Sequence, residues 1–112
     1  MSQQGFHRIS VQQAASLMSS GAVVVDVRDP LSYQQGHMPG ALHLGNSNLA
    51  EFVSQADQDA PTIVVCYHGH ASQGAAAYLH SMDFTRVYSM DGGYSQWQLL
   101  QPQLDEQARN DR

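Results

Sequence analysis

Along this chain of 112 residues, short apolar runs alternate with segments in which apolar positions recur at helical spacing. Short apolar runs between polar ends are typical of strands, and they occur at residues 6–9, 22–25, 41–44, 63–65 and 87–90. After each run comes a segment of helical character, at residues 10–20, 30–35, 46–54, 72–81 and 94–100. This alternation predicts an α/β fold with a largely parallel sheet and helices on both faces.

Local signals sharpen two of the helices. Ser10 followed by Gln13 is the pattern of a capping box, in which each side chain bonds the other residue's backbone N–H. Asp29 followed by Pro30 predicts an N-cap and a proline at the first helical position. Gly36 is expected to end that short helix.

The C-terminal third contains a sharp turn and a polar end. Asp91, Gly92 and Gly93 predict the turn, and Trp97 is expected on the inner face of the helix that follows. We expect one domain over residues 1–112, with its core at about 6–100 and a polar tail at 102–112 that frays.

Cys66 is the only cysteine, and it stands where the apolar run 63–65 ends and a short loop leads into a helix opened by Ser72. In open α/β sheets, binding crevices lie at the carboxyl ends of strands. A helix N-terminus lowers the pKa of a thiol, and the thiolate is the reactive form. The alternative is an inert buried cysteine, but the strand–loop–helix context favours a nucleophile.

Composition limits the partners and the location. Ten acidic and five basic residues give a net charge of −5, which disfavours nucleic acid as a partner. One cysteine excludes an internal disulfide and a multi-cysteine zinc site. The first ten residues lack an apolar signal region and no long apolar run follows, so we expect a soluble cytoplasmic protein with no membrane partner.

Three segments together resemble one protein family. VVDVRDPLSYQQGHMPGALHL resembles its D-x-R and G-H-x-P-G-A motifs, VVCYHGHAS its active-site loop, and VYSMDGGYSQW its D-G-G-x-x-x-W ending. In this order and spacing they are similar to the single-domain rhodaneses, most closely to the GlpE type of thiosulfate sulfurtransferase. The resemblance covers about residues 6–100 and implies the rhodanese fold, a five-stranded parallel sheet between helices.

The resemblance also implies a ping-pong reaction. The Cys66 thiolate would take the outer sulfur of thiosulfate, and the resulting persulfide would pass it to cyanide, a small thiol or a redox protein such as thioredoxin. Asp26 and Arg28 would brace the loops near the site, most simply as a structural ion pair. No metal or organic cofactor is implied. The persulfide would be cradled by the backbone N–H groups of Tyr67, His68, Gly69, His70, Ala71 and Ser72.

The same residues favour other functions less. Cysteine phosphatases and arsenate reductases resemble C-x5-R, whose arginine clamps the oxyanion, but Ser72 occupies that position here. Non-catalytic modules of the family usually lack the cysteine. A metal site formed by Cys66, His68 and His70 would distort a loop this tight, and His37 is expected to be a hydrogen-bonded structural histidine.

Overall fold

The computed structural model describes the backbone of residues 5–110 and side chains up to Asp105. Within these residues the chain forms a parallel five-stranded sheet with the spatial order β1-β5-β4-β2-β3. The strands are β1 His7–Ile9, β2 Val23–Asp26, β3 Leu42–His43, β4 Thr62–Val65 and β5 Val87–Met90. The predicted α/β fold class is confirmed, and the first strand lies at an edge of the sheet.

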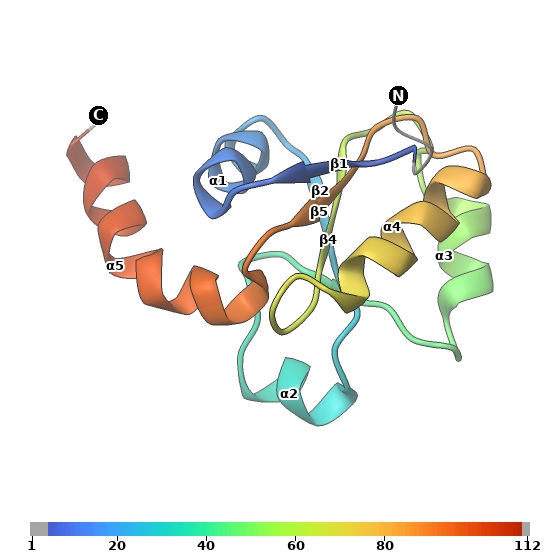
Figure 1. Cartoon of the computed structure of the whole chain (residues 1–112), viewed down its shortest axis with the longest axis horizontal. Helices are drawn as coiled ribbons and strands as arrows, with labels where there is room; N and C mark the ends of the chain where they lie inside the picture. Colours follow the sequence, from blue (N-terminus) through green and yellow to red (C-terminus); the bar gives the residue numbers. More distant parts are fainter. Residues whose placement is uncertain (1–4, 111–112) are drawn as a thin grey trace.

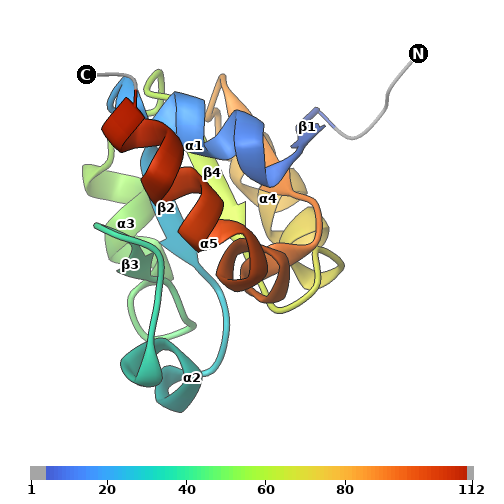
Figure 2. The same ribbon diagram turned by 90° about the vertical axis from the view of Figure 1, so that its left-hand side faces the viewer.

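Helices cover both faces of the sheet. They are α1 Val11–Ser19, α2 Pro30–Gln35, α3 Leu49–Gln55, α4 Ala71–Ser81 and α5 Gly93–Asn110. Figure 1 shows α1 and α5 on one side of the sheet and α3 and α4 on the other. Helix α2 lies beyond the carboxyl ends of the strands, as the turned view in Figure 2 also shows.

The core consists of two apolar layers that the alternation along each strand separates. On β4, Ile63 and Val65 join the layer that contains Trp97, which is 6% exposed. Val64 points to the opposite layer, which contains Leu79 and Phe84. Since β4 is buried on both faces, its residues read as a continuous apolar run in the sequence.

The predicted caps are present. The Ser10 hydroxyl accepts a hydrogen bond from the N–H of Gln13, and the Gln13 side chain accepts one from the N–H of Ser10. Asp29 caps α2 with Pro30 at the first position, and the helix ends before Gly36. These short-range signals fix helix ends because they satisfy N–H groups that the helix itself leaves unpaired.

Two predicted helix limits were wrong. Helix α4 begins at Ala71, not at Ser72, and follows His70, which makes no side-chain cap. The last helix does not end at residue 100: as α5 it continues through Pro102 to Asn110, and residues 111–112 of the predicted polar tail lie outside the described residues. Proline removes one backbone hydrogen bond, and beyond it Leu104 packs against the layer that contains Trp97. Within residues 5–110, no helix has the length and apolar character needed to cross a membrane.

Replacing Leu104 tests how α5 is held beyond its proline. We expect Leu104→Ala to lower the free energy of unfolding by about 1–2 kcal/mol, less than the roughly 2–5 typical of a fully buried leucine. Leu99, on the same helix, is 74% exposed, so Leu99→Ala should change stability by no more than about 0.5 kcal/mol. Urea denaturation of both variants measures the difference, and equal effects would contradict packing of Leu104 against the core.

Candidate active site

Cys66 follows the last residue of β4 and is 3% exposed, with a free thiol. The loop that it opens ends at His70, just before α4, and it lies at the same end of the sheet as α2 (Figure 1). The sulfur thus lies at the carboxyl end of a central strand and at a helix N-terminus, as the sequence predicted. Both features favour an anion at this position.

Hydrogen bonds converge on the Cys66 sulfur. The N–H of Gly69 donates to Sγ over 3.1 Å, and Ser72 Oγ lies 3.2 Å from Sγ. Burial by itself raises the pKa of the Cys66 thiol, but hydrogen bonds from the Ser72 hydroxyl and from the N–H groups of Ser72, Gly69 and His68 outweigh it. The net pKa is lower than that of an ordinary thiol, so a larger fraction of Cys66 is thiolate at neutral pH.

The loop keeps this orientation because its carbonyl groups are engaged elsewhere. The N–H of Tyr94 donates to the carbonyl of Cys66 over 2.8 Å, and that of Ser95 donates to the carbonyl of Tyr67 over 3.1 Å. Both donors belong to the first turn of α5, where N–H groups have no partner within the helix. Because α5 binds these two carbonyls, the N–H groups that come later in the loop can point toward the sulfur.

Two glycines allow this close approach. At Gly93, φ is +60°, and a Cβ would lie 2.4 Å from the carbonyl carbon of Tyr67. At Gly69, φ is +93°, and a Cβ would lie 2.8 Å from the backbone nitrogen of Gly92. Other residues seldom adopt such angles, and neither position has room for a side chain. Gly92 and Gly93 form the predicted turn, and Gly93 in addition allows α5 to meet the Cys66 loop.

A second serine lies behind Ser72. Ser72 is fully buried on the inner face of α4, and its hydroxyl lies 2.8 Å from that of Ser89 on β5, which is fully buried as well. Sequence reasoning predicted only the backbone N–H of Ser72 and did not single out Ser89. The available signal was a serine inside the otherwise apolar run of the last strand.

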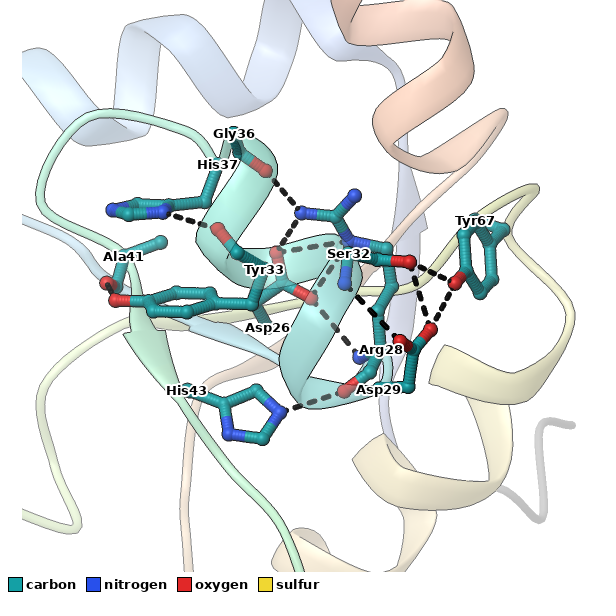
Figure 3. A network of polar contacts seen from close by, with 10 residues as sticks. All are labelled: Asp26, Arg28, Asp29, Ser32, Tyr33, Gly36, His37, Ala41, His43 and Tyr67. Carbon is teal, nitrogen blue, oxygen red and sulfur yellow. Dashed lines mark hydrogen bonds and ion pairs between the residues drawn. The ribbon is translucent and has the colours of Figure 1, made fainter.

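Asp26 and Arg28 form a buried ion pair at the end of β2. The guanidinium donates to both carboxylate oxygens, with the shortest distance, 2.7 Å, between Nη2 and Oδ2. The same Nη2 donates to the carbonyl of Gly36 over 2.7 Å (Figure 3). The guanidinium also lies 4.1 Å from the ring centre of Tyr94. The pair therefore connects the end of β2, the end of α2 and the start of α5.

A polar network joins α2 to the Cys66 loop. The Tyr67 hydroxyl donates to the Asp29 carboxylate and contacts the Ser32 hydroxyl, as Figure 3 shows. Hydrogen bonds from Tyr67 and Ser32 lower the pKa of Asp29 to about 2. These contacts with Asp29 and Ser32 fix the side chain of Tyr67 across the outside of the loop.

His37 Nδ1 lies 2.8 Å from the carbonyl of Tyr33, which fits the expected structural histidine.

The predicted cradle residues divide into two groups. The N–H of Gly69 donates to Sγ and those of His68 and Ser72 lower the pKa of the thiol, whereas those of Tyr67, His70 and Ala71 make no hydrogen bond to Sγ in the described chain. The side chains of His68 and His70 are exposed. Among residues whose side chains are described, no three His, Cys, Asp or Glu residues are grouped to hold a metal ion.

A cavity of about 500 Å³ opens on the other side of the Arg28–Asp29 segment. It lies between the segments that follow β2 and β3 and helix α4, and Cys66 is not among its lining residues. Its walls include Pro30, Leu49 and Tyr78. The sulfur site is therefore separate from this cavity.

Comparisons with known proteins agree on one family. Residues 10–100 match the family described as Rhodanese-like domain. The chain is 56% identical over 97 residues to thiosulfate sulfurtransferase GlpE of Pseudomonas entomophila, covering 87% of this chain and 89% of that protein. It is 52% identical over 106 residues to the protein of that name from Pseudomonas fluorescens strain Pf0-1, covering 95% and 97%.

A solved structure gives the same result for the fold. The crystal structure of a rhodanese-related protein from Thermoplasma volcanium superposes with a TM-score of 0.71 at 24% sequence identity. The match covers 82% of this chain and 90% of that one. At this identity the likeness concerns the fold alone, and it agrees with the five-stranded parallel arrangement described above.

Adding a methyl group at Gly93 tests the support of the loop by α5. We expect Gly93→Ala to displace the carbonyls of Cys66 and Tyr67, weaken the N–H contacts to sulfur and raise the pKa of the thiol. Loss of one hydrogen bond to a charged group, ~1.5–3 kcal/mol, corresponds to roughly one to two pKa units. The midpoint of iodoacetamide alkylation against pH should therefore move up.

Gly74 provides the matched control. It lies within α4, and a Cβ there would meet nothing within 4 Å. Gly74→Ala should leave the alkylation midpoint unchanged and stabilise the helix by about 0.5–1 kcal/mol. A Gly93→Ala protein with an unaltered midpoint would show that the sulfur does not depend on this contact.

Proposed function

The chain belongs to the rhodanese family, and from this premise we propose that it is a thiosulfate sulfurtransferase with Cys66 as its sulfur carrier. The observation that carries the proposal is the Cys66 sulfur at the end of β4, facing the N–H of Gly69 and the hydroxyl of Ser72. A site that stabilises a sulfur anion suits both thiolate attack and a persulfide intermediate.

In the first half-reaction the Cys66 thiolate attacks the outer sulfur of thiosulfate. A new S–S bond forms, the S–S bond of thiosulfate breaks, and sulfite leaves with the electron pair. The product is the Cys66 persulfide, which carries the negative charge on its outer sulfur. Charge is conserved and no proton is transferred, so the site needs to stabilise an anion and has no need of a general base.

The second half-reaction returns the enzyme to its starting state. An acceptor attacks the outer sulfur, and the Cys66 thiolate leaves with the electron pair of the broken bond. With cyanide the product is thiocyanate. With a dithiol, whether a small molecule or a redox protein such as thioredoxin, the acceptor becomes a disulfide and the sulfur leaves as hydrogen sulfide. A lowered thiol pKa helps here, because it makes Cys66 a better leaving group.

The N–H groups of Tyr67, His70 and Ala71 have a role in this scheme although they make no hydrogen bond to Sγ. The persulfide extends one S–S bond beyond Sγ, and we assign the remaining loop N–H groups to its outer sulfur. Asp26 and Arg28 act through position: they hold the ends of β2, α2 and α5 around the loop. Neither touches the sulfur.

Replacing Cys66 by serine tests the sulfur carrier. After incubation with thiosulfate, the wild-type protein should gain one sulfur atom by intact mass spectrometry, and cyanide should remove it as one equivalent of thiocyanate. Cys66→Ser should remain folded by circular dichroism, gain no sulfur and lose thiosulfate:cyanide activity, because serine is a poor nucleophile and a poor sulfur carrier. Activity in the folded variant would refute the assignment.

A second experiment tests how the acidic protein binds a dianion with no fixed cation in the loop. At pH 8 an ordinary histidine is mostly neutral, so His70→Lys adds a permanent charge at the exposed start of α4. Solvent exposure limits the gain to roughly 0.5–1 kcal/mol, so KM for thiosulfate should fall about two- to fivefold while kcat changes less.

His80→Lys is the matched control, since His80 is exposed at the opposite end of the same helix. It should leave KM unchanged. Alkylation against pH in both variants separates donor binding from any change in the thiolate fraction. An unchanged KM in His70→Lys, with the same thiol titration as wild type, would show that His70 lies outside the donor site.

A further inference from the structure

We infer that Ser89 is a positioning residue that holds the Ser72 hydroxyl as a hydrogen-bond donor to the Cys66 sulfur anion. The inference rests on the proposed function, in which this sulfur alternates between thiolate and persulfide. It concerns a residue of β5 far from Cys66 in the sequence and behind the active-site loop. Ser89 does not touch the sulfur and acts only through Ser72.

The three groups form a line from the strand to the sulfur. Ser89 Oγ lies 2.8 Å from Ser72 Oγ, and Ser72 Oγ lies 3.2 Å from Cys66 Sγ. Both serines are fully buried, so water is not available as an alternative partner for their hydroxyls. Ser89 stands in register with Val64, two residues before Cys66, which places Ser89 on the α4 side of the sheet.

Counting protons gives the direction of each hydrogen bond. A serine hydroxyl has one proton to donate and lone pairs that accept. When Cys66 is a thiolate or persulfide, the sulfur can only accept, so Ser72 must donate to it. The oxygen of Ser72 is then free to accept from Ser89. Every hydroxyl proton in the line points toward the negative charge, with no bond made or broken.

Without Ser89 the direction of the Ser72 hydroxyl is less restricted. Ser72 is the second residue of α4, so the carbonyl four residues earlier lies in the loop and the helix itself does not fix the Ser72 rotamer. A Ser72 hydroxyl that turns away from the sheet no longer donates to the sulfur. The Ser89 hydroxyl favours the productive rotamer, because it offers a hydrogen bond that Ser72 accepts only while facing the sheet.

The test is a double-mutant cycle on thiol titration. Wild type, Ser72→Ala, Ser89→Ala and the double variant are alkylated with iodoacetamide across a pH series. Loss of the Ser72 hydroxyl should raise the thiol midpoint by roughly one pKa unit, and loss of Ser89 by about half a unit, which is a threefold change in the ionisation constant. In the Ser72→Ala background, Ser89→Ala should add nothing.

Thr62→Val controls for the loss of a buried hydroxyl as such. Thr62 is 1% exposed at the far end of β4, and its hydroxyl donates to the carbonyl of Ala60. This variant should lower stability and leave the alkylation midpoint unchanged. A merely structural role for Ser89 predicts the same result for Ser89→Ala.

Two results would overturn the inference. One is a wild-type midpoint in Ser89→Ala while Ser72→Ala shifts. The other is a Ser89→Ala shift of equal size with and without the Ser72 hydroxyl, which would mean that Ser89 acts by packing. Alkylation uses no sulfur donor, so failure of the proposed function appears separately, as a wild-type protein that gains no sulfur from thiosulfate.

Discussion

The site depends on how the backbone polar groups of one loop are divided. The carbonyls of Cys66 and Tyr67 accept hydrogen bonds from the first turn of α5. The C=O and N–H of a trans peptide point in opposite directions, so the Tyr67 carbonyl held by α5 turns the N–H of His68 toward the other side, where it and the N–H of Gly69 lower the pKa of the Cys66 thiol. The helix after β5 is therefore as much a part of the site as the loop, although it contributes no side chain to the sulfur.

The buried ion pair of Asp26 and Arg28 also holds the segments around the Cys66 loop in place. A buried pair gains little net stability from its charges, since desolvation offsets their attraction, and its value lies in fixed direction. Arg28 donates to Asp26 and to the carbonyl of Gly36 and lies over the ring of Tyr94, so one planar group fixes three segments. Lysine at this position would not have the same effect, because an ammonium lacks the planar fork that bonds both partners.

Much of the fold could be predicted because its signals are local. Two helix starts show this. The side chains of Ser10 and Gln13 accept hydrogen bonds from backbone N–H groups at the start of α1, and the Asp29 side chain accepts one at the start of α2. In each case both partners lie within four residues of the sequence. The end of α5 could not be predicted in this way. Pro102 indicates a break, and only the distant layer that Leu104 packs against explains why the helix continues. At Pro102, tertiary packing outweighs the low helix propensity of proline.

In the site, too, local signals predict some residues and tertiary structure alone places others. Cys66 could be placed at a strand end and helix start from the residues beside it, whereas Ser89 required the register of β5 on β4. Successive strand residues alternate between faces, so Val64 and Cys66 share one face. A shift of β5 by one residue would turn Ser89 to the other face of the sheet and present Met90 to Ser72 instead. The hydroxyl line to the sulfur thus exists only in one register, and no pattern within residues 87–90 specifies it.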